Sequence, residues 1–200
     1  MSDIILIEDF ITEAEEQQLI NLATTYPGNY RHSPGAPGRM IRFGSFEKTQ
    51  DLIVDSQAKA EGYKSYGRRS YSTMNDGIDV SIDVMPDNIT ALGLRLVEAS
   101  VVTATPAVAV LNVYKANQRI GRHIDHKDNG PVIPVVGLQS DSELIFTTRD
   151  KSVVKRVKFP RRAMLAISGD ARNVLFHETP AIATPRMSLV FRCLPSPVPL

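Results

Sequence analysis

The second half of the chain consists of short segments rich in β-branched residues, with turn residues between them. The segments lie at 103–114, 131–138, 143–148, 152–159, 163–168, 173–178 and 186–194. Many short strands at regular spacing are typical of an all-β sandwich or barrel, and a jelly roll is the form used by cupin-like sites. We therefore expect a mostly β (α+β) fold with a jelly-roll core.

Two helices are predicted ahead of these strands. Thr12 and Glu15 have the spacing of a capping box, and an apolar helical face follows them. Pro86 and Asp87 begin a second helix at about 88–99, which also has one apolar face. The apolar residues are Leu19, Ile20, Leu22 and Ala23 in the first helix and Ile89, Leu92, Leu96 and Val97 in the second. Residues 4–7 form a short apolar run, either a strand or a lead-in to the core.

Composition narrows the class of protein. Two hundred residues suit one domain, so we expect residues 1–200 to form a single domain. The net charge of +1 means that any surface for nucleic acid must be local. The single cysteine, Cys193, excludes an internal disulfide and lies in an apolar run, which indicates a buried thiol and a reducing compartment. The N-terminus does not resemble a signal peptide and no run is long enough to span a membrane, so a cytoplasmic protein without membrane contact is expected.

His123 and Asp125 form a His-x-Asp motif, and His177 follows about fifty residues later. On an extended backbone His123 and Asp125 point the same way, so both can reach one metal ion. Two histidines and one carboxylate occupy one face of an octahedral Fe(II) and leave the other open. The nearby His126 offers an alternative His-x-x-His zinc pair, but zinc requires three or four nitrogen or sulfur ligands. We interpret His126 as an outer-sphere or substrate-side residue.

Two arginines lie six residues apart in the last predicted strand, at Arg186 and Arg192. An even separation places both on the same face of a strand. Burying two guanidinium groups without anions would be costly, so this face is expected to hold anionic ligands. For Arg192 alone, an arginine at a strand end that reaches solvent is the alternative.

Taken together, these residues resemble the AlkB family of Fe(II)- and 2-oxoglutarate-dependent dioxygenases. The motifs are Asn112-x-Tyr114, His123-x-Asp125, Ser168-Gly169-Asp170-x-Arg172, His177 and Arg186-x-Ser188-x-x-x-Arg192, within about residues 78–194. The resemblance implies a double-stranded β-helix (jelly roll) that binds Fe(II), 2-oxoglutarate and O2. It implies metal ligation by His123, Asp125 and His177, and 2-oxoglutarate binding by Asn112, Tyr114, Arg186, Ser188 and Arg192. Many members have Asn where this chain has Ser188, whose hydroxyl can still donate a hydrogen bond.

Residues 26–77 contain many turn residues and no long periodic element. Arginines and aromatic residues alternate in this segment, at Tyr30, Arg31, Arg39, Arg42, Phe43, Tyr63, Tyr66, Arg68, Arg69 and Tyr71. Such a segment either binds an unpaired or flipped nucleotide or is a solvated loop whose tyrosines cover the core. In the AlkB family it corresponds to the nucleotide-recognition lid. The resemblance therefore implies substrate contacts for Arg39, Phe43, Tyr71, Lys127 and Arg172.

The implied reaction couples oxidative decarboxylation of 2-oxoglutarate to hydroxylation of a C–H bond. On an N-alkylated base in DNA or RNA this chemistry removes the alkyl group, and a single-stranded or flipped base bound by a monomer is the expected substrate. Lys127 stands where well-known members have an acidic residue, and its charge disfavours a cationic methylated base. Oxygenation of a protein side chain or small molecule therefore stays open. A metal-free jelly-roll binding module is a third reading, against which the intact iron and arginine sets argue.

A second basic feature is the segment 151–162, which contains Lys151, Lys155, Arg156, Lys158, Arg161 and Arg162. We predict that it forms an edge hairpin. The hairpin either lies along phosphates or is a solvated strand protected by charge against edge-to-edge aggregation.

Overall fold

The computed structural model describes residues 3–26, 29–30, 35–44, 81–82, 84–125 and 129–193. The helices are α1 (Glu13–Thr25), α4 (Asp87–Glu98) and α5 (Gly169–Asn173). The strands are β1 (Ile4–Ile7), β2 (Asn29–Tyr30), β3 (Arg39–Phe43), β4 (Ser81–Ile82), β5 (Val108–Tyr114), β6 (Ile120–His123), β7 (Ile133–Leu138), β8 (Ser142–Thr147), β9 (Val153–Phe159), β10 (Met164–Ile167), β11 (Phe176–Thr179) and β12 (Arg186–Arg192).

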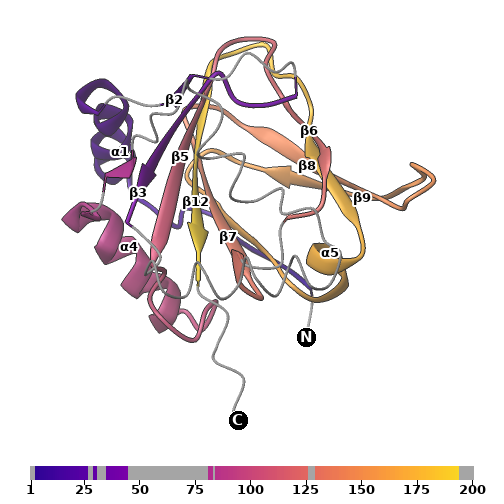
Figure 1. The fold of residues 1–200 in the computed structure, drawn as a ribbon, viewed down its shortest axis with the longest axis horizontal. Helices are drawn as coiled ribbons and strands as arrows, with labels where there is room; N and C mark the ends of the chain where they lie inside the picture. Colours follow the sequence, from indigo (N-terminus) through magenta and orange to yellow (C-terminus); the bar gives the residue numbers. More distant parts are fainter. Residues whose placement is uncertain are drawn as a thin grey trace.

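The strands form two sheets that lie side by side in Figure 1. The large sheet has the order β1-β10-β7-β12-β5-β3-β2, with β4 paired to β3, and the small sheet has the order β6-β11-β8-β9. Every pairing between these strands is antiparallel except that of β3 with β4. Two antiparallel sheets with few helices form a jelly roll, so the predicted fold class is confirmed.

Helices α1 and α4 cover one face of the large sheet (Figure 1). Leu111, Leu189 and Phe191, fully buried on β5 and β12, pack in one cluster with Leu19 of α1 and Leu96 of α4. Burial of such side chains contributes on the order of 2 kcal/mol each. The amphipathic helices predicted from the sequence therefore stabilise the back of the large sheet.

Both helix predictions are confirmed in position and cause. Thr12 caps α1, and its hydroxyl accepts from the Glu15 amide while the Glu15 carboxylate accepts from the Thr12 amide. The carboxylate of Glu16, buried on the same helix, accepts from Arg161 Nε at 2.7 Å and from the Gln139 amide at 2.7 Å. Helix α1 is thus attached to the loops at one end of the sheet.

A second apolar cluster fills the space between the two sheets. It contains Ile133, Leu165 and Ile167 from the large sheet and Phe146 and Phe159 from the small sheet. This cluster holds the sheets together and leaves the ends of the barrel for polar residues.

Residues 4–7, for which the sequence left a strand or a lead-in to the core open, form strand β1, which pairs with β10. Other elements differ from the sequence prediction. Strand β6 was not predicted, because none of its four residues is fully buried and no apolar alternation marks it. The predicted strand at 173–178 begins only at Phe176, because the one-turn helix α5 occupies the residues before it.

Cys193 lies at the end of β12 and is buried, as predicted. Burial raises the pKa of its thiol to about 11. In the part of the chain that the structure describes, no helix combines the length and apolarity needed to cross a bilayer.

Candidate metal centre and cosubstrate pocket

Three possible metal ligands meet at one end of the barrel. His123 ends β6 and lies directly opposite His177 of β11, with the two ring centroids 4.4 Å apart. Asp125 follows two residues after His123, and its Oδ2 lies 3.4 Å from His177 Nε2. One ligand atom from each residue lies within 4.8 Å of the other two, so the three side chains could hold one ion.

The orientation of His123 suits metal binding. Its Nδ1 lies 2.8 Å from the carbonyl oxygen of Gly121, so in the tautomer that donates from Nδ1 the Nε2 lone pair is available. The Nδ1 atom of His177 is buried and has no hydrogen-bond partner in the described structure.

The electrostatics keep both kinds of ligand in their metal-binding forms. Burial lowers the pKa of His123, and the charge of His177 lowers it further, so the imidazole stays neutral. Burial alone would raise the pKa of Asp125, but the hydrogen bond to His177 and the charges of His177, His123 and Arg192 hold it below its usual range. An ionised carboxylate on Asp125 and a neutral imidazole on His123 are in the forms that bind a divalent metal ion.

Four of the residues predicted to bind the cosubstrate occupy the inner face of the large sheet, the face turned away from the helices. Arg186 lies opposite Tyr114, and Ser188 lies opposite Asn112, in the register of β12 and β5. All four are buried. Four polar side chains on one buried patch of sheet require a polar partner, because burying such groups unsatisfied costs free energy.

The surroundings of the Arg186 guanidinium indicate the chemistry of that partner. Its side chain is only 2% exposed, and its Nε and Nη2 atoms have no hydrogen-bond partner in the described structure. The guanidinium lies 5.9 Å from the Tyr114 ring and 5.1 Å from the Phe159 ring, and no acid among the described residues forms an ion pair with it. Burial lowers the pKa of Arg186 accordingly. A carboxylate bound at this point would satisfy the free donors and neutralise the charge.

Tyr114 and Asn112 fit the same pocket. Burial raises the pKa of Tyr114, against the charge of Arg186 and side-chain hydrogen bonds with Ser188 and Asn112, so the phenol stays protonated and can donate. The Oδ1 atom of Asn112 is buried without a hydrogen-bond partner in the described structure. The Ser142 hydroxyl is also buried without a hydrogen-bond partner in the described structure. Ser142 lies opposite Phe159 in the pairing of β8 with β9. The sequence did not single out Ser142 or Phe159, whose relation to Arg186 depends on the pairing of distant strands.

Arg192 lies on the same face of β12 as Arg186, at the metal end of the strand. It is half-buried, and its charge acts on both Asp125 and His123. Arg172 is buried on α5, where its Nη1 donates to Asn173 Oδ1 at 2.6 Å. The predicted spacing of the two strand arginines therefore gives one at each end of the pocket.

Two of the predicted substrate residues lie on the helix side of the large sheet. Phe43 is fully buried among the helix-side residues, with its ring edge-on to Tyr26 at 5.4 Å. Arg39 is on the same face and donates to the Ala23 carbonyl of α1. Strand alternation directs both side chains toward α1 and away from the inner face, and their contact with a substrate stays a prediction.

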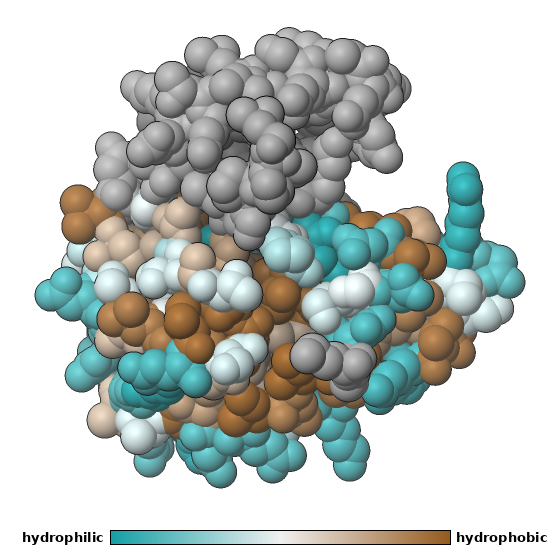
Figure 2. Space-filling model, turned by 90° about the horizontal axis from the view of Figure 1, so that it is seen from below, coloured by the Kyte–Doolittle hydropathy of each residue, from teal (hydrophilic) through white to brown (hydrophobic). Residues whose placement is uncertain are grey.

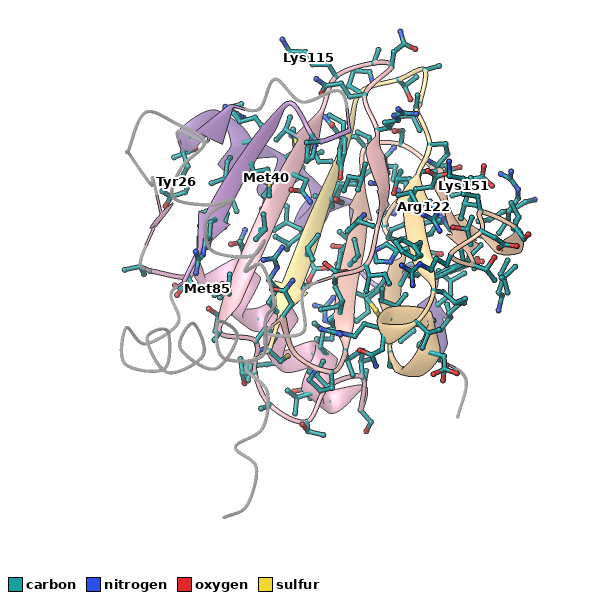
Figure 3. All side chains as sticks on the ribbon, turned by 45° about the vertical axis from the view of Figure 1, so that its right-hand side comes forward. Tyr26, Met40, Met85, Lys115, Arg122 and Lys151 are labelled. Atoms are coloured by element: carbon teal, nitrogen blue, oxygen red, sulfur yellow. The ribbon has the colours of Figure 1, made fainter. Side chains whose placement is uncertain are left out.

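The same alternation places Met40 and Arg42 on the inner face. Met40 lies opposite Asn112, and Arg42 lies opposite Val110. Figure 3 shows Met40 on the side of β3 away from the helices. The sequence predicts that alternate residues of this strand share a face. It does not predict which of the two faces points toward the space between the sheets. Tyr71, Lys127 and His126 lie outside the described residues.

Hydrogen bonds connect the loop at residues 35–38 to β6, the strand that ends at His123, and to the turn before it. The Gly121 amide donates to the Gly35 carbonyl at 2.9 Å, while the Gly121 carbonyl faces His123 Nδ1. The Gly38 amide donates to Gln118 Oε1 at 3.0 Å, and a β-carbon on Gly38 would lie 2.6 Å from that oxygen. A side chain at position 38 would require the Gln118 amide to move, and the two hydrogen bonds attach the loop to the turn that precedes β6.

A separate cavity of about 390 Å3 lies behind the large sheet, between α4 and the ends of β5 and β12. Its lining includes Met85, Ile89, Pro106 and Phe191 and none of the metal or cosubstrate candidates. This cavity is therefore separate from the candidate metal and cosubstrate residues.

A jelly roll that brings two histidines and an aspartate to one end and a buried, unsatisfied arginine to the other has the arrangement of a non-haem iron oxygenase. The family model of the 2OG-Fe(II) oxygenase superfamily matches residues 3–193, and the chain belongs to that family. It is an Fe(II)/2-oxoglutarate-dependent dioxygenase, and its cofactors are Fe(II), 2-oxoglutarate and O2.

Solved structures show the same fold at low sequence identity. The chain is similar to OsALKBH1, with a TM-score of 0.62 and 16% identity over 96% of this chain and 98% of that one. It is similar to a Pseudomonas putida prolyl-4-hydroxylase, with a TM-score of 0.55 and 13% identity over 96% and 94% of the two chains. A Trichoplax adhaerens prolyl hydroxylase, solved with a hypoxia inducible factor peptide fragment, has a TM-score of 0.52 and 14% identity over 95% and 83%. The search of curated proteins gives no match.

Proposed function

We propose that this dioxygenase is of the AlkB type and oxidatively dealkylates N-alkylated bases in DNA or RNA. In this proposal residues 1–200 form one domain, with the lid at about 26–77 and the catalytic core at about 78–194. His123, Asp125 and His177 hold the iron. Arg186, Ser188, Tyr114, Asn112 and Arg192 hold 2-oxoglutarate, and the unsatisfied guanidinium of Arg186 is the observation that carries this assignment.

When bound, iron and 2-oxoglutarate with dioxygen supply the oxidation that hydroxylates a C–H bond. The chain's own residues position the reactants. Arg186 fixes the distal carboxylate by paired hydrogen bonds, and Tyr114 donates a further one. Gly121 holds the His123 ring in its metal-binding orientation. The apolar cluster around Phe146 and Phe159 excludes water from the space between the sheets.

The nucleic-acid assignment is supported by the charge of the inner face. β3 brings Arg42 to this face, where it lies opposite Val110 of β5. Arginine is well suited to contact phosphate oxygens, and Met40 beside Arg42 offers an apolar surface to a base. The similarity to OsALKBH1 over nearly the whole chain supports the same assignment.

The test begins with anaerobic titration of Fe(II) and 2-oxoglutarate, followed by addition of oxygen and assay of succinate. Single- and double-stranded oligonucleotides that carry N-methylated bases are then compared with unmodified ones. The proposal expects methylated oligonucleotides to stimulate succinate formation and to lose their methyl groups by mass. Succinate formation that no methylated oligonucleotide stimulates would contradict it.

A second candidate is hydroxylation of a polypeptide side chain. Two of the similar structures are prolyl hydroxylases, one of them solved with a peptide fragment. The cation at Lys127 also favours a substrate other than a positively charged base. Stimulation of succinate formation by proline-containing peptides, with a mass gain of one oxygen on the peptide, would favour this second function.

A further inference from the structure

The positive charge of this protein is concentrated in one segment. Residues 149–162 contain seven of the 23 lysines and arginines and one of the 22 acidic residues. The segment has a net charge of +6 in a chain whose net charge is +1, so the rest of the chain is acidic on balance. Such a separation of charge creates a local positive field that a near-neutral total conceals.

Three of these seven cations have partners within the fold. Arg156 pairs with Glu143 at 2.8 Å, Arg161 with Glu16 at 2.7 Å and Arg162 with Asp9 at 3.4 Å. The remaining four, Arg149, Lys151, Lys155 and Lys158, are exposed and form no ion pair with any described residue. We call these four residues the basic hairpin.

The one acid in the segment does not neutralise the basic hairpin. Asp150 accepts hydrogen bonds from the Thr148 hydroxyl, from the Ser152 hydroxyl at 3.2 Å and from the Ser152 amide at 3.3 Å. Both of its oxygens are therefore used to close the turn between β8 and β9. The turn projects from the right-hand side of the molecule in Figure 1, and hydrophilic residues gather on the same side in Figure 2.

The basic hairpin is adjacent to the metal centre. Across the small sheet, His123 pairs with His177, His177 with Phe146 and Phe146 with Lys155, so the four share one row on one face. Lys155 is thus two strands from His177, roughly 10 Å at the usual spacing between strands. From there the remaining cations extend along β9 and its turn.

Arg122 attaches the turn to the strand that carries the metal ligand. It donates to the Thr147 hydroxyl at 2.8 Å, to the Thr148 carbonyl and to the Arg149 carbonyl at 3.2 Å. Its guanidinium also lies 3.7 Å from the centre of the Phe176 ring. Arg122 and Lys151 lie on the same side of the molecule in Figure 3. Because His123 is the next residue after Arg122, the basic hairpin has a fixed position relative to the site.

We propose that the basic hairpin binds the phosphate backbone of the nucleic-acid strand whose target base enters the site, an inference that rests on the proposed function. Protection of the β9 edge would explain Lys155 and Lys158, but not Arg149 and Lys151, which lie in the turn beyond the strand. From Lys151 to Lys155 an extended chain spans roughly 13 Å, several phosphate spacings along a strand, whereas alternation directs Lys158 to the opposite face of β9 from Lys155. Cations spread along a length fit a backbone of regular charge.

The test measures binding of a single-stranded oligonucleotide with one N-methylated base to the anaerobic, iron-loaded protein, by fluorescence anisotropy at several salt concentrations. The variant Lys151→Gln with Lys155→Gln is compared with Lys115→Gln with Arg119→Gln, which removes two exposed cations from the loop between β5 and β6. For the first variant, the slope of log affinity against log salt should become shallower by about 1.4, since each phosphate contact on a single strand contributes about 0.7. The second variant should keep the wild-type slope.

Each alternative outcome is distinguishable, provided that thermal unfolding shows both variants folded. If the wild type binds and both variants keep its slope, the role of the basic hairpin is refuted while the proposed function stands. If the wild type shows no salt-dependent binding at low salt, both are refuted. If Lys151→Gln with Lys155→Gln loses affinity for poly-glutamate but not for the oligonucleotide, the hairpin binds acidic polypeptide instead and the inference is overturned.

Discussion

The two faces of the large sheet are made by the same strands and have opposite chemistry. On β5 and β12, Leu111, Leu189 and Phe191 point to the helices and are fully buried among apolar side chains. The residues between them, such as Asn112, Arg186 and Ser188, point inward and are equally buried, yet Asn112 and Arg186 keep unsatisfied polar atoms. Burial stabilises the first face and costs free energy on the second.

On a single strand, the side chains of one face stabilise the fold and those of the other face are available for ligand binding. A protein that buries a guanidinium with two unsatisfied donors must offset the cost elsewhere, and here the helix side of the same sheet provides the offset. Substitutions on the helix side should therefore change the free energy of unfolding, whereas substitutions on the inner face should change ligand binding and turnover.

The largest effect is expected at the metal centre. Asp125→Ala should lower succinate formation by more than about 100-fold, since loss of even an outer-shell partner of a metal ligand costs roughly 10- to 100-fold. Thermal unfolding of the metal-free protein should change little. The matched control is Glu178→Ala, which removes the carboxylate next to His177 that alternation directs to the opposite face of β11. Wild-type turnover in Asp125→Ala would refute the iron assignment.

The helix side should respond in stability. Phe191→Ala should lower the free energy of unfolding by about 3 to 5 kcal/mol, the usual cost of removing a buried phenyl ring. Denaturant titration measures it. If the residual folded protein keeps the wild-type requirement for 2-oxoglutarate, the two faces act separately. A large change in the 2-oxoglutarate requirement would show that the two faces do not act separately.

Arg186→Met should show the opposite pattern. The 2-oxoglutarate concentration for half-maximal turnover should rise roughly 10- to 100-fold, the value of a hydrogen-bonded charge pair. The ligand-free variant should be as stable as the wild type or more so, because the substitution removes a buried charge without a partner. In the control Arg95→Met, on the helix side, the 2-oxoglutarate requirement should not change. An unchanged requirement in Arg186→Met would mean that this anchor is misplaced.

The smallest effect concerns the contact between the helices. Glu15 pairs with Arg95 at 2.5 Å, which lowers the pKa of Glu15 to about 2. Because Arg95 is partly exposed, we expect Glu15→Gln to cost about 1 kcal/mol at neutral pH. A depressed carboxyl pKa stabilises above the unfolded-state pKa, so the difference between wild type and variant should persist above about pH 4.5 and disappear as the pH falls toward 2. Urea titrations across that range measure it, and a constant difference would contradict the assignment.

Local periodicity made much of the site predictable. The spacing of His123 and Asp125, and of Arg186 and Arg192, depends on the two-residue repeat of an extended chain, which the sequence displays directly. The capping box at Thr12 is equally local. Where one strand or one turn determines the geometry, the sequence is sufficient.

Pairing between distant segments was not predictable. Alternation placed Arg39 and Phe43 on one face of β3 and Met40 and Arg42 on the other, but the packing of Ile41 and Phe43 in the helix-side cluster determines which face is inward. Arg161 belonged to one basic run in the sequence, yet it pairs with Glu16, 145 residues away. The orientation of β3 and the Arg161–Glu16 pair both depend on contacts between segments that are far apart in the sequence.

The single buried thiol has a practical consequence. Cys193 is 8% exposed, and with a thiol pKa of about 11 it is almost wholly protonated at neutral pH, so alkylating reagents react with it slowly. Because the chain has one cysteine, a second one introduced on the surface would be the only reactive thiol of the folded protein. A fluorophore or a cross-linker can therefore be attached at one chosen point of the native sequence without first removing Cys193.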